Sequence, residues 1–377
     1  MSLSTKTMTP KALAPEFSQI LAQESPMTFA RYMELCLYHP TFGYYARAPK
    51  IGKKGDYFTA PTIHPVFGAA VAKQIIEIWK LLGKPKDFVV LEAGAGEGYL
   101  ALDILNFLSL EGLGFSYFIL EPFEANRKQQ QIKLKDHPGV SWFKSWEEIP
   151  PFVGVFLSNE LFDAFPVHLI EKTPDHDLKE VYVIKEGDLL GEELSGLSQP
   201  EILTRVLPYA NYWPEGYRTE VCLAYGPFLK EVAKKLCRGA LITFDYGYSR
   251  ADLYHPDRRQ GTLLCFKEHR VFDNPYLLPG GCDLTTHVDF TALKEEGEKL
   301  GLYPVGFTTQ AAFLVGLGVE KLLARIGRNT PRDVEALKLL LLPQGLGMSH
   351  WVLVQGRDLP LEVKLSGFSL SNRLNIL

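Results

Sequence analysis

Residues 88–98 read FVVLEAGAGEG, an apolar run that leads directly into three closely spaced glycines. The apolar run is typical of a buried strand, and the residues from Tyr99 to Leu110 follow a helical pattern. A glycine-rich turn between a strand and its helix lets a ligand approach the backbone closely, and it points helix N–H groups toward that ligand. The stretch therefore predicts an α/β fold with a binding site where its first strand ends.

The chain around this stretch alternates between strand and helix patterns. Apolar runs predict further strands at 117–120, 140–143, 153–157 and 240–244. Helical spacing predicts helices at 125–134 and 228–236 between them, and a helix at 290–300 and a last strand at 351–354 near the end. Such alternation is typical of a parallel sheet with helices on both faces. We therefore predict a doubly wound, Rossmann-like fold that binds ligands at the carboxyl ends of its strands.

Three segments add to this core. Two short amphipathic helices begin the chain, and the stretch 39–65 is rich in glycine, proline and aromatic residues and long enough to form a lid. Two strand-like pieces beyond residue 166 break the alternation and predict an insertion. The expected divisions are N-terminal helices and lid in 1–82, the core with a C-terminal extension in 83–166 and 218–377, and an insertion subdomain in 167–217.

Composition narrows the class of protein. The 377 residues carry 40 Lys and Arg against 44 Asp and Glu, a net charge of −4, which makes nucleic acid a poor candidate partner. Neither a membrane-spanning apolar run nor a signal peptide is recognisable, so we expect a cytoplasmic protein that does not insert into membranes. The five cysteines lack a CxxC pair and the nine histidines lack HxH or HExxH spacing, so we expect buried thiols and no metal site.

The glycine turn fits one cofactor class better than two others. The dinucleotide fingerprint requires a glycine where Tyr99 stands, and a phosphate-binding P-loop requires a Lys-Ser or Lys-Thr pair that is missing. The GxGxG spacing behind an acidic residue instead resembles the first motif of S-adenosylmethionine-dependent methyltransferases. Glu121 closes the second strand and is placed to accept the two ribose hydroxyls, although it could instead be solvated. Glu92 precedes the glycines and could contact the cofactor, or instead cap the helix or order water. The predicted cofactor-binding residues are Glu92, Gly94, Gly96, Gly98 and Glu121.

The fourth strand ends in the polar stretch SNELFDAFP, residues 158–166. In this fold the fourth strand brings its tip to the reacting methyl group, so Asn159, Glu160 and Asp163 are the candidate catalytic residues. If Asn159 caps a short helix, the two acids lie three residues apart on one side of it. They could then hold a guanidinium by bidentate hydrogen bonds, while the alternative is a capped turn whose acids face water.

Seven ordered motifs make the resemblance more specific. They are EAGAGEG, YFILEPFEANRKQQ, SNELFDAFPVH, FDYGY, GTLLCFKEH, DLTTHVDF and TTQAAFLVGLGV. Together they resemble the mitochondrial complex I assembly-factor protein arginine methyltransferases and their bacterial relatives, over residues 43–353. The resemblance implies a class I methyltransferase core, S-adenosylmethionine as methyl donor and, for the mitochondrial member, methylation of arginine in a respiratory-chain subunit. It also implies that the cofactor and strand-four residues named above are the functional ones.

Later motifs add residues whose roles spacing does not settle. We expect Asp245, Tyr246 and His287 to contact the substrate, although Asp245 could instead brace the strand-four loop. His269 and Asp283 belong to the family's later motifs, and their spacing does not indicate a role for either residue.

Three positions depart from the family pattern, because Thr62 and Ala69 stand where relatives carry Glu and Trp351 where they carry Lys. The lost acids leave open an alternative function, a non-catalytic assembly or scaffold protein that retains the fold. A third reading, an NAD-dependent oxidoreductase, is disfavoured by Tyr99. The sequence does not predict an oligomeric state.

Overall fold

The computed structural model describes residues 13–47, 59–187, 189–360 and 363–377. Part of the expected lid, with Tyr57 and Phe58, lies outside these residues. The chain forms two compact units, each made of segments that are separate in the sequence. The described residues of 59–163, 225–250 and 287–377 form the sheet unit, and those of 13–47, 164–224 and 251–286 form the small unit.

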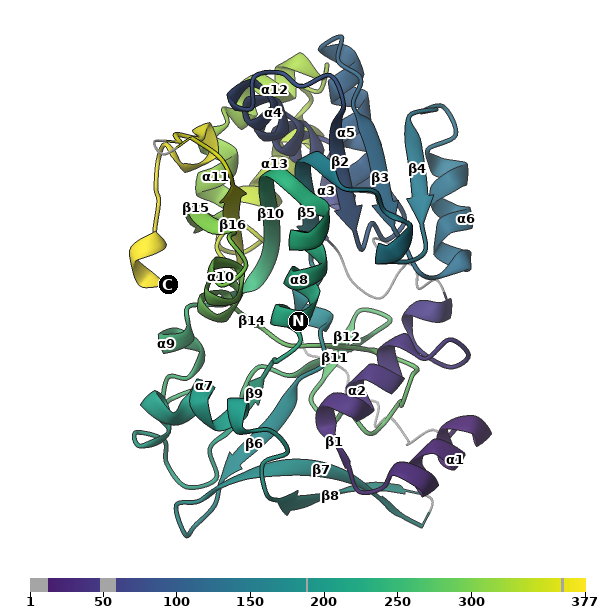
Figure 1. Ribbon diagram of the computed structural model, residues 1–377, viewed down its shortest axis with the longest axis vertical. Helices are drawn as coiled ribbons and strands as arrows, with labels where there is room; N and C mark the ends of the chain where they lie inside the picture. The colour runs from purple at the N-terminus through teal and green to yellow at the C-terminus, as the bar shows by residue number, and fades with distance from the viewer. Residues whose placement is uncertain (1–12, 48–58, 188, 361–362) are drawn as a thin grey trace. The chain divides into compact units, whose positions relative to one another are not determined.

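The sheet unit is built on a sheet with the strand order β15-β16-β10-β5-β2-β3-β4 (Figure 1). The strands are β2 Phe88–Ala93, β3 Ser116–Leu120, β4 Val140–Phe143, β5 Phe152–Asn159, β10 Leu236–Tyr248, β15 Tyr303–Thr309 and β16 His350–Arg357, and β14 Val288–Asp289 pairs with the end of β10. Every residue of β2 is buried, as expected for a central strand covered on both faces. The strands predicted from the apolar runs are present, and β5 and β10 extend further than predicted.

The sheet is parallel, as the alternation indicated, except at one strand. The four neighbouring pairs from β10 to β4 are parallel, but β16 runs antiparallel to both β10 and β15. Three helices separate β15 from β16, and the chain re-enters the sheet at the edge where β15 ended, since Thr309 pairs with Trp351. As a result β16 begins, rather than ends, at the carboxyl edge of the parallel strands.

Helices of the sheet unit cover the sheet and form its apolar core. They are α3 Ala60–Ile63, α4 Val66–Leu81, α5 Tyr99–Leu110, α6 Glu124–Lys133, α8 Tyr225–Lys235, α10 Phe290–Glu298, α11 Gln310–Gly316, α12 Val319–Arg325 and α13 Pro331–Leu341, with the short 3-10 helices η2 Trp146–Glu148, η4 Ser366–Phe368 and η5 Leu374–Ile376. The short 3-10 helix η3 Phe162–Ala164 spans the boundary of the unit. Buried side chains of α4, α5 and α11 pack with those of β2, β5 and β10 in one cluster. This packing holds the carboxyl ends of the strands in place.

The small unit combines an antiparallel sheet with the first helices. Its elements are α1 Pro15–Glu24, β1 Met27–Thr28, α2 Phe29–Tyr38, η1 Tyr45–Arg47, β6 His168–Lys172, β7 Leu178–Glu186, β8 Leu189–Ser195, α7 Pro200–Ala210, β9 Arg218–Val221, β11 Leu264–Lys267, β12 Arg270–Phe272 and β13 Asp283–Thr285, and α9 Arg250–Leu253 spans its boundary. The sheet has the order β1-β7-β6-β9, with β8 paired to β7. The N-terminal helices and the insertion therefore share one fold.

The observed units differ from the expected division at α4 and at three other stretches. Helix α4 belongs to the sheet unit, although we expected residues up to 82 to stand apart. Residues 164–166, 218–224 and 251–286 join the small unit, although we expected them in the core. The physical reason is burial, because Phe29 and Met33 of α2 pack with Val181 of β7 and Cys265 of β11 in a single apolar cluster. Sequence separation did not reveal that shared core.

All five cysteines are free thiols. None of the helices in the described ranges combines the length and apolar character needed to cross a lipid bilayer.

Candidate active site

The glycine turn after β2 has a backbone that strongly favours glycine. Gly94, Gly96 and Gly98 have φ angles of 72°, 52° and 83°, in the left-handed region that side chains disfavour. A β-carbon on Gly94 would also lie 2.9 Å from Cδ1 of Leu161. The turn therefore carries no side chains over its glycine backbone at the N-terminus of α5, whose first N–H groups lack helical partners. It also lies directly against the loop that follows β5.

Glu121, which follows β3, is held beside this turn by Gln130 of α6. The Phe123 N–H donates to Glu121 Oε1 at 3.0 Å, and Gln130 Nε2 donates both to Glu121 Oε2 at 3.2 Å and to the Gly96 carbonyl at 2.8 Å. Trp142 Nε1 donates to Gln130 Oε1 at 3.1 Å, which fixes the orientation of the amide. Burial raises the pKa of Glu121 above its ordinary value.

Gln130 is a positioning residue that the sequence analysis missed. It lies in a run of three glutamines, Gln129 to Gln131, and nothing in that run distinguishes the one that reaches Gly96. Only the packing of α6 against β4 and the turn selects it, because Gln130 is buried while Gln131 is exposed.

Glu92 is fully buried near the end of β2, next to a strand that supplies its hydrogen bond. The Tyr117 hydroxyl of β3 donates to Glu92 Oε2 at 2.6 Å. Burial raises the pKa of Glu92 from 4.5 to about 7, although the hydrogen bond from Tyr117 works in the opposite direction. A direct contact between Glu92 and the cofactor stays a prediction, whereas its bond to Tyr117 is a feature of the fold.

The raised pKa of Glu92 predicts a pH-dependent stability. Because the folded-state pKa lies near 7 and the ordinary value is 4.5, Glu92 contributes stability below pH 4.5 that is lost as the pH rises through 7. The loss amounts to about 3 kcal/mol in the free energy of unfolding. In a Glu92→Gln variant this contribution should disappear, so its stability should fall less between acidic and alkaline buffer. Urea unfolding of the ligand-free protein at several pH values measures this, and parallel curves for the two proteins would contradict it.

The tip of β5 does not have the helical arrangement that the sequence offered as one alternative. Asn159 is the last residue of β5 and not a helix cap, and Glu160 has a left-handed φ of 49°. The short helix η3 starts only at Phe162, so Glu160 and Asp163 do not share one side of a helix. The Glu160 N–H donates to the Phe244 carbonyl at 2.8 Å, which ties this turn to β10.

Asp245, near the end of β10, braces the loop after β5. Its Oδ2 accepts the N–H groups of Leu161 at 3.2 Å and Phe162 at 3.0 Å, and its Oδ1 accepts the Tyr246 N–H at 2.9 Å. The side chain is fully buried. Of the two roles that the sequence left open, these contacts support bracing.

Three carboxyl groups gather at this edge of the sheet, and we call Glu160, Asp163 and Asp245 the carboxylate cluster. Burial first, and then the negative charges of Asp163 and Glu160, raise the pKa of Asp245 well above its ordinary value. The Tyr246 hydroxyl donates to Asp163 Oδ2, and Asn159 Nδ2 donates to Glu160 Oε1 at 3.2 Å. Like charges held this close favour the binding of a cation, because a cation relieves their repulsion.

Two histidines adjoin the cluster. The ring of His287 lies 5.2 Å from that of Tyr246 and 5.0 Å from that of Tyr248, between centroids. His350 places Nε2 3.7 Å from Glu160 Oε1. The sequence analysis missed His350, because a parallel last strand would have put its first residue at the opposite edge of the sheet.

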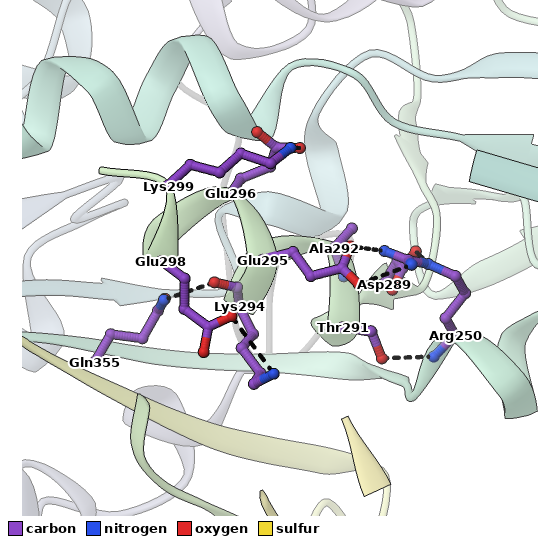
Figure 2. Close-up of polar contacts among 10 residues, drawn as sticks. All are labelled: Arg250, Asp289, Thr291, Ala292, Lys294, Glu295, Glu296, Glu298, Lys299 and Gln355. Carbon is purple, nitrogen blue, oxygen red and sulfur yellow. Dashed lines mark hydrogen bonds and ion pairs between the residues drawn. The ribbon is translucent and has the colours of Figure 1, made fainter. Parts of the chain in front are cut away.

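Arg250, which follows β10, forms ion pairs with Asp289 and with Glu295 of α10 (Figure 2). Arg250 Nε contacts Asp289 Oδ2 at 3.1 Å, and the guanidinium binds both oxygens of Glu295 at 3.0 and 2.6 Å. Asp289 also caps α10, since its Oδ1 accepts the Ala292 N–H at 2.8 Å. Because His287 precedes β14, which pairs with β10, this link keeps the histidine beside the tyrosine rings.

The remaining sequence candidates occupy other environments. In the small unit, Asp283 accepts a hydrogen bond from the Tyr45 hydroxyl at 2.9 Å, and His269 is exposed at the β11–β12 turn. In the sheet unit, Thr62 bonds to the Thr59 carbonyl at 2.8 Å and closes the first turn of α3, while Ala69 is buried in the apolar core. The two departures from the family's acids thus serve local packing in this chain.

Comparison with known proteins agrees with the geometry of the turn. A family model described as "Putative S-adenosyl-L-methionine-dependent methyltransferase" matches residues 70–308, more than half of the chain. The chain belongs to this methyltransferase family.

Individual relatives match a larger share of this chain than the family model does. The rat protein arginine methyltransferase NDUFAF7, mitochondrial, is 28% identical over 333 residues, which cover 78% of this chain and 71% of the relative. The zebrafish protein of the same name is 27% identical, covering 92% and 87%. A solved structure from Burkholderia thailandensis, described as a "likely methyl transferase" bound to S-adenosyl-homocysteine, has a TM-score of 0.88 at 28% identity, covering 98% of this chain and all of that one.

The expected Rossmann-like methyltransferase fold is therefore confirmed, and S-adenosylmethionine is the cofactor. The residues present fit it, because Gly94 presents an exposed backbone without a side chain and Glu121 offers a buried carboxylate of the kind that accepts ribose hydroxyls. When bound, the cofactor supplies a methyl group on a positively charged sulfur. Gly94, Gly96, Gly98 and Glu121 are the residues that would hold it.

Proposed function

We propose that the protein methylates arginine in a protein partner, and that the partner is a respiratory-chain subunit. The observation that carries the first proposal is the carboxylate cluster, placed at the sheet edge next to the cofactor turn. Relatives named protein arginine methyltransferase support the first part. The second part is supported by the resemblance of the motifs to the complex I assembly-factor methyltransferases. A cytoplasmic location stays a prediction.

The cluster suits a guanidinium better than a neutral acceptor. A guanidinium is a planar cation with five N–H donors, and it matches carboxylates in bidentate pairs. Asn159 adds a side-chain oxygen, Oδ1, that is buried and accepts no hydrogen bond from any described residue. Glu160, Asp163 and Asn159 thus present acceptors that a cationic donor would satisfy.

The carboxylate cluster lies close to the turn that would hold the methyl donor. Because Leu161 touches the glycine turn, Glu160 lies one residue from a direct contact with the cofactor-binding backbone. Such a site would raise the rate mainly by orientation, because it holds the guanidinium nitrogen in line with the methyl group. Glu160 would align the guanidinium and accept its proton late in the reaction.

Labelling in a lysate tests the proposal. Lysate from cells that lack the protein is incubated with radiolabelled S-adenosylmethionine and either wild-type protein or Glu160→Gln, and the labelled band is hydrolysed to identify the methylated amino acid. We expect methylarginine with the wild type and about 100-fold less with Glu160→Gln, because the variant loses the acceptor for the proton. The exposed Glu193→Gln serves as the matched control and should retain activity.

Three outcomes bear on the proposal. Label on another amino acid would refute arginine as the acceptor, and a labelled band that is not a respiratory-chain subunit would refute the proposed partner. If no band depends on Glu160 while titration calorimetry shows that the wild type and Glu160→Gln bind S-adenosyl-homocysteine equally, the non-catalytic scaffold is favoured instead.

A further inference from the structure

His350 connects the carboxylate cluster to the surface of the sheet unit. Its Nε2 lies 3.7 Å from Glu160 Oε1, and its Nδ1 lies 3.0 Å from Ser349 Oγ. The side chains of Glu160 and His350 are only 8% and 7% exposed, whereas Ser349 is exposed. The three side chains therefore lie in a row from a buried acid to solvent, and the step between Glu160 and His350 is longer than a direct hydrogen bond.

The antiparallel direction of β16 creates this path. His350 is the first residue of β16 and pairs with Tyr246 of β10, so its imidazole lies at the edge where the cluster gathers. Its ring centroid is 5.5 Å from that of Tyr246, in a T-shaped arrangement that limits rotation of the imidazole. Imidazole is suited to a relay, because one nitrogen can accept a proton while the other donates one.

Methylation of arginine releases a proton, which needs a path to solvent. Arginine and methylarginine each carry one positive charge, while the sulfonium becomes a neutral thioether when its carbon–sulfur bond breaks and the electron pair stays on sulfur. Charge therefore balances only if the guanidinium nitrogen that gains the methyl carbon loses one proton. Glu160 is buried, so a proton that it accepts needs a route to water.

We propose that His350 carries this proton from Glu160 to Ser349 and solvent. The inference rests on the proposed arginine methylation, because the proton originates on the guanidinium. The 3.7 Å separation needs one bridging water or a small rotation of Glu160, as is common before substrate tightens a site. His350 acts through Glu160 and does not touch the substrate, so it is a positioning residue.

Several titratable groups face or adjoin His350. Glu160 from the β5 loop and Tyr246 from β10 face its ring directly. Asp163 acts through the Tyr246 hydroxyl, and Asp245 lies beside Tyr246 in β10. After each transfer the imidazole must release its proton toward Ser349 before the next turnover.

The test compares His350→Gln with wild-type protein, because glutamine keeps polar atoms at this position but does not titrate. The rate of methylarginine formation in lysate from cells lacking the protein is measured across neutral pH, with and without added imidazole. We expect a rate at least about tenfold lower, a loss of the pH dependence that His350 confers, and recovery when imidazole is added. Calorimetric binding of S-adenosyl-homocysteine should remain unchanged, and the exposed His255→Gln is the matched control.

The outcomes separate this inference from the function on which it rests. If the wild type forms methylarginine and His350→Gln keeps the same rate and pH profile, the relay is wrong and the proposed function stands. If His350→Gln is slow but imidazole does not restore it, His350 has a structural role and the relay is also wrong. If the wild type labels no arginine, both the proposed function and the relay fall.

Discussion

Replacing Gly94 with valine should lower the affinity for S-adenosyl-homocysteine by about 100-fold. Gly94 has a φ of 72°, which a β-branched residue tolerates poorly, and its added β-carbon would meet Leu161 at 2.9 Å. Leu161 and the loop after β5 would have to shift away from the turn to make room for the side chain. Titration calorimetry with S-adenosyl-homocysteine measures the affinity directly.

Gly112→Val separates the binding effect from backbone strain. Gly112 has a φ of 70°, and an added β-carbon there would meet nothing within 4 Å. Both variants should therefore lose stability through strain of roughly 1 to 3 kcal/mol, but only Gly94→Val should lose binding. Equal affinities of the two variants would show that the turn does not hold the cofactor.

The second large effect concerns Asp245, whose replacement by alanine should lower the free energy of unfolding by about 3 kcal/mol. Three backbone N–H groups, those of Leu161, Phe162 and Tyr246, would lose their acceptor in a buried site. Relief of the repulsion with Asp163 and Glu160 offsets part of this loss. Urea unfolding gives the stability, and methyl transfer should be lost because the loop that carries Glu160 loses its brace.

Two comparisons sharpen the test of Asp245. Asp245→Asn keeps one acceptor oxygen, so it should be destabilised less than Asp245→Ala, and the exposed Asp136→Ala should be neutral. The bracing role would be contradicted if Asp245→Ala unfolded like the wild type and lost only activity. That result would instead support the contact with substrate that the sequence left open.

Local patterns predicted most of the sheet unit. The helix expected at 125–134 is α6, Glu124–Lys133, and the strand expected at 153–157 is the centre of β5, Phe152–Asn159. These elements depend on apolar periodicity and turn residues that are close in the sequence, so a short window contains their signal. The position of Glu121 at the end of β3 followed in the same way.

Long-range pairing produced the differences from those predictions. The direction of β16 depends on three intervening helices, and the shared core of α2 and β7 depends on contacts between residues about 150 positions apart, such as Met33 and Val183. No local pattern encodes either one. The helix that the sequence offered as one alternative at Asn159 does not form for a similar reason, because bonds from β10 hold the loop after β5 in another shape.

The sequence by itself determined the glycine turn, the alternation of strands and helices, and the acids at the strand ends, since each follows from the conformational preferences of neighbouring residues. The tertiary structure alone decided which side chains meet there. It brought Gln130 to Gly96, Asp245 to the loop that carries Glu160, and His350 to Glu160. These contacts arise from strand order and direction, which are set by the burial of apolar faces across the whole sheet unit and not by any one segment.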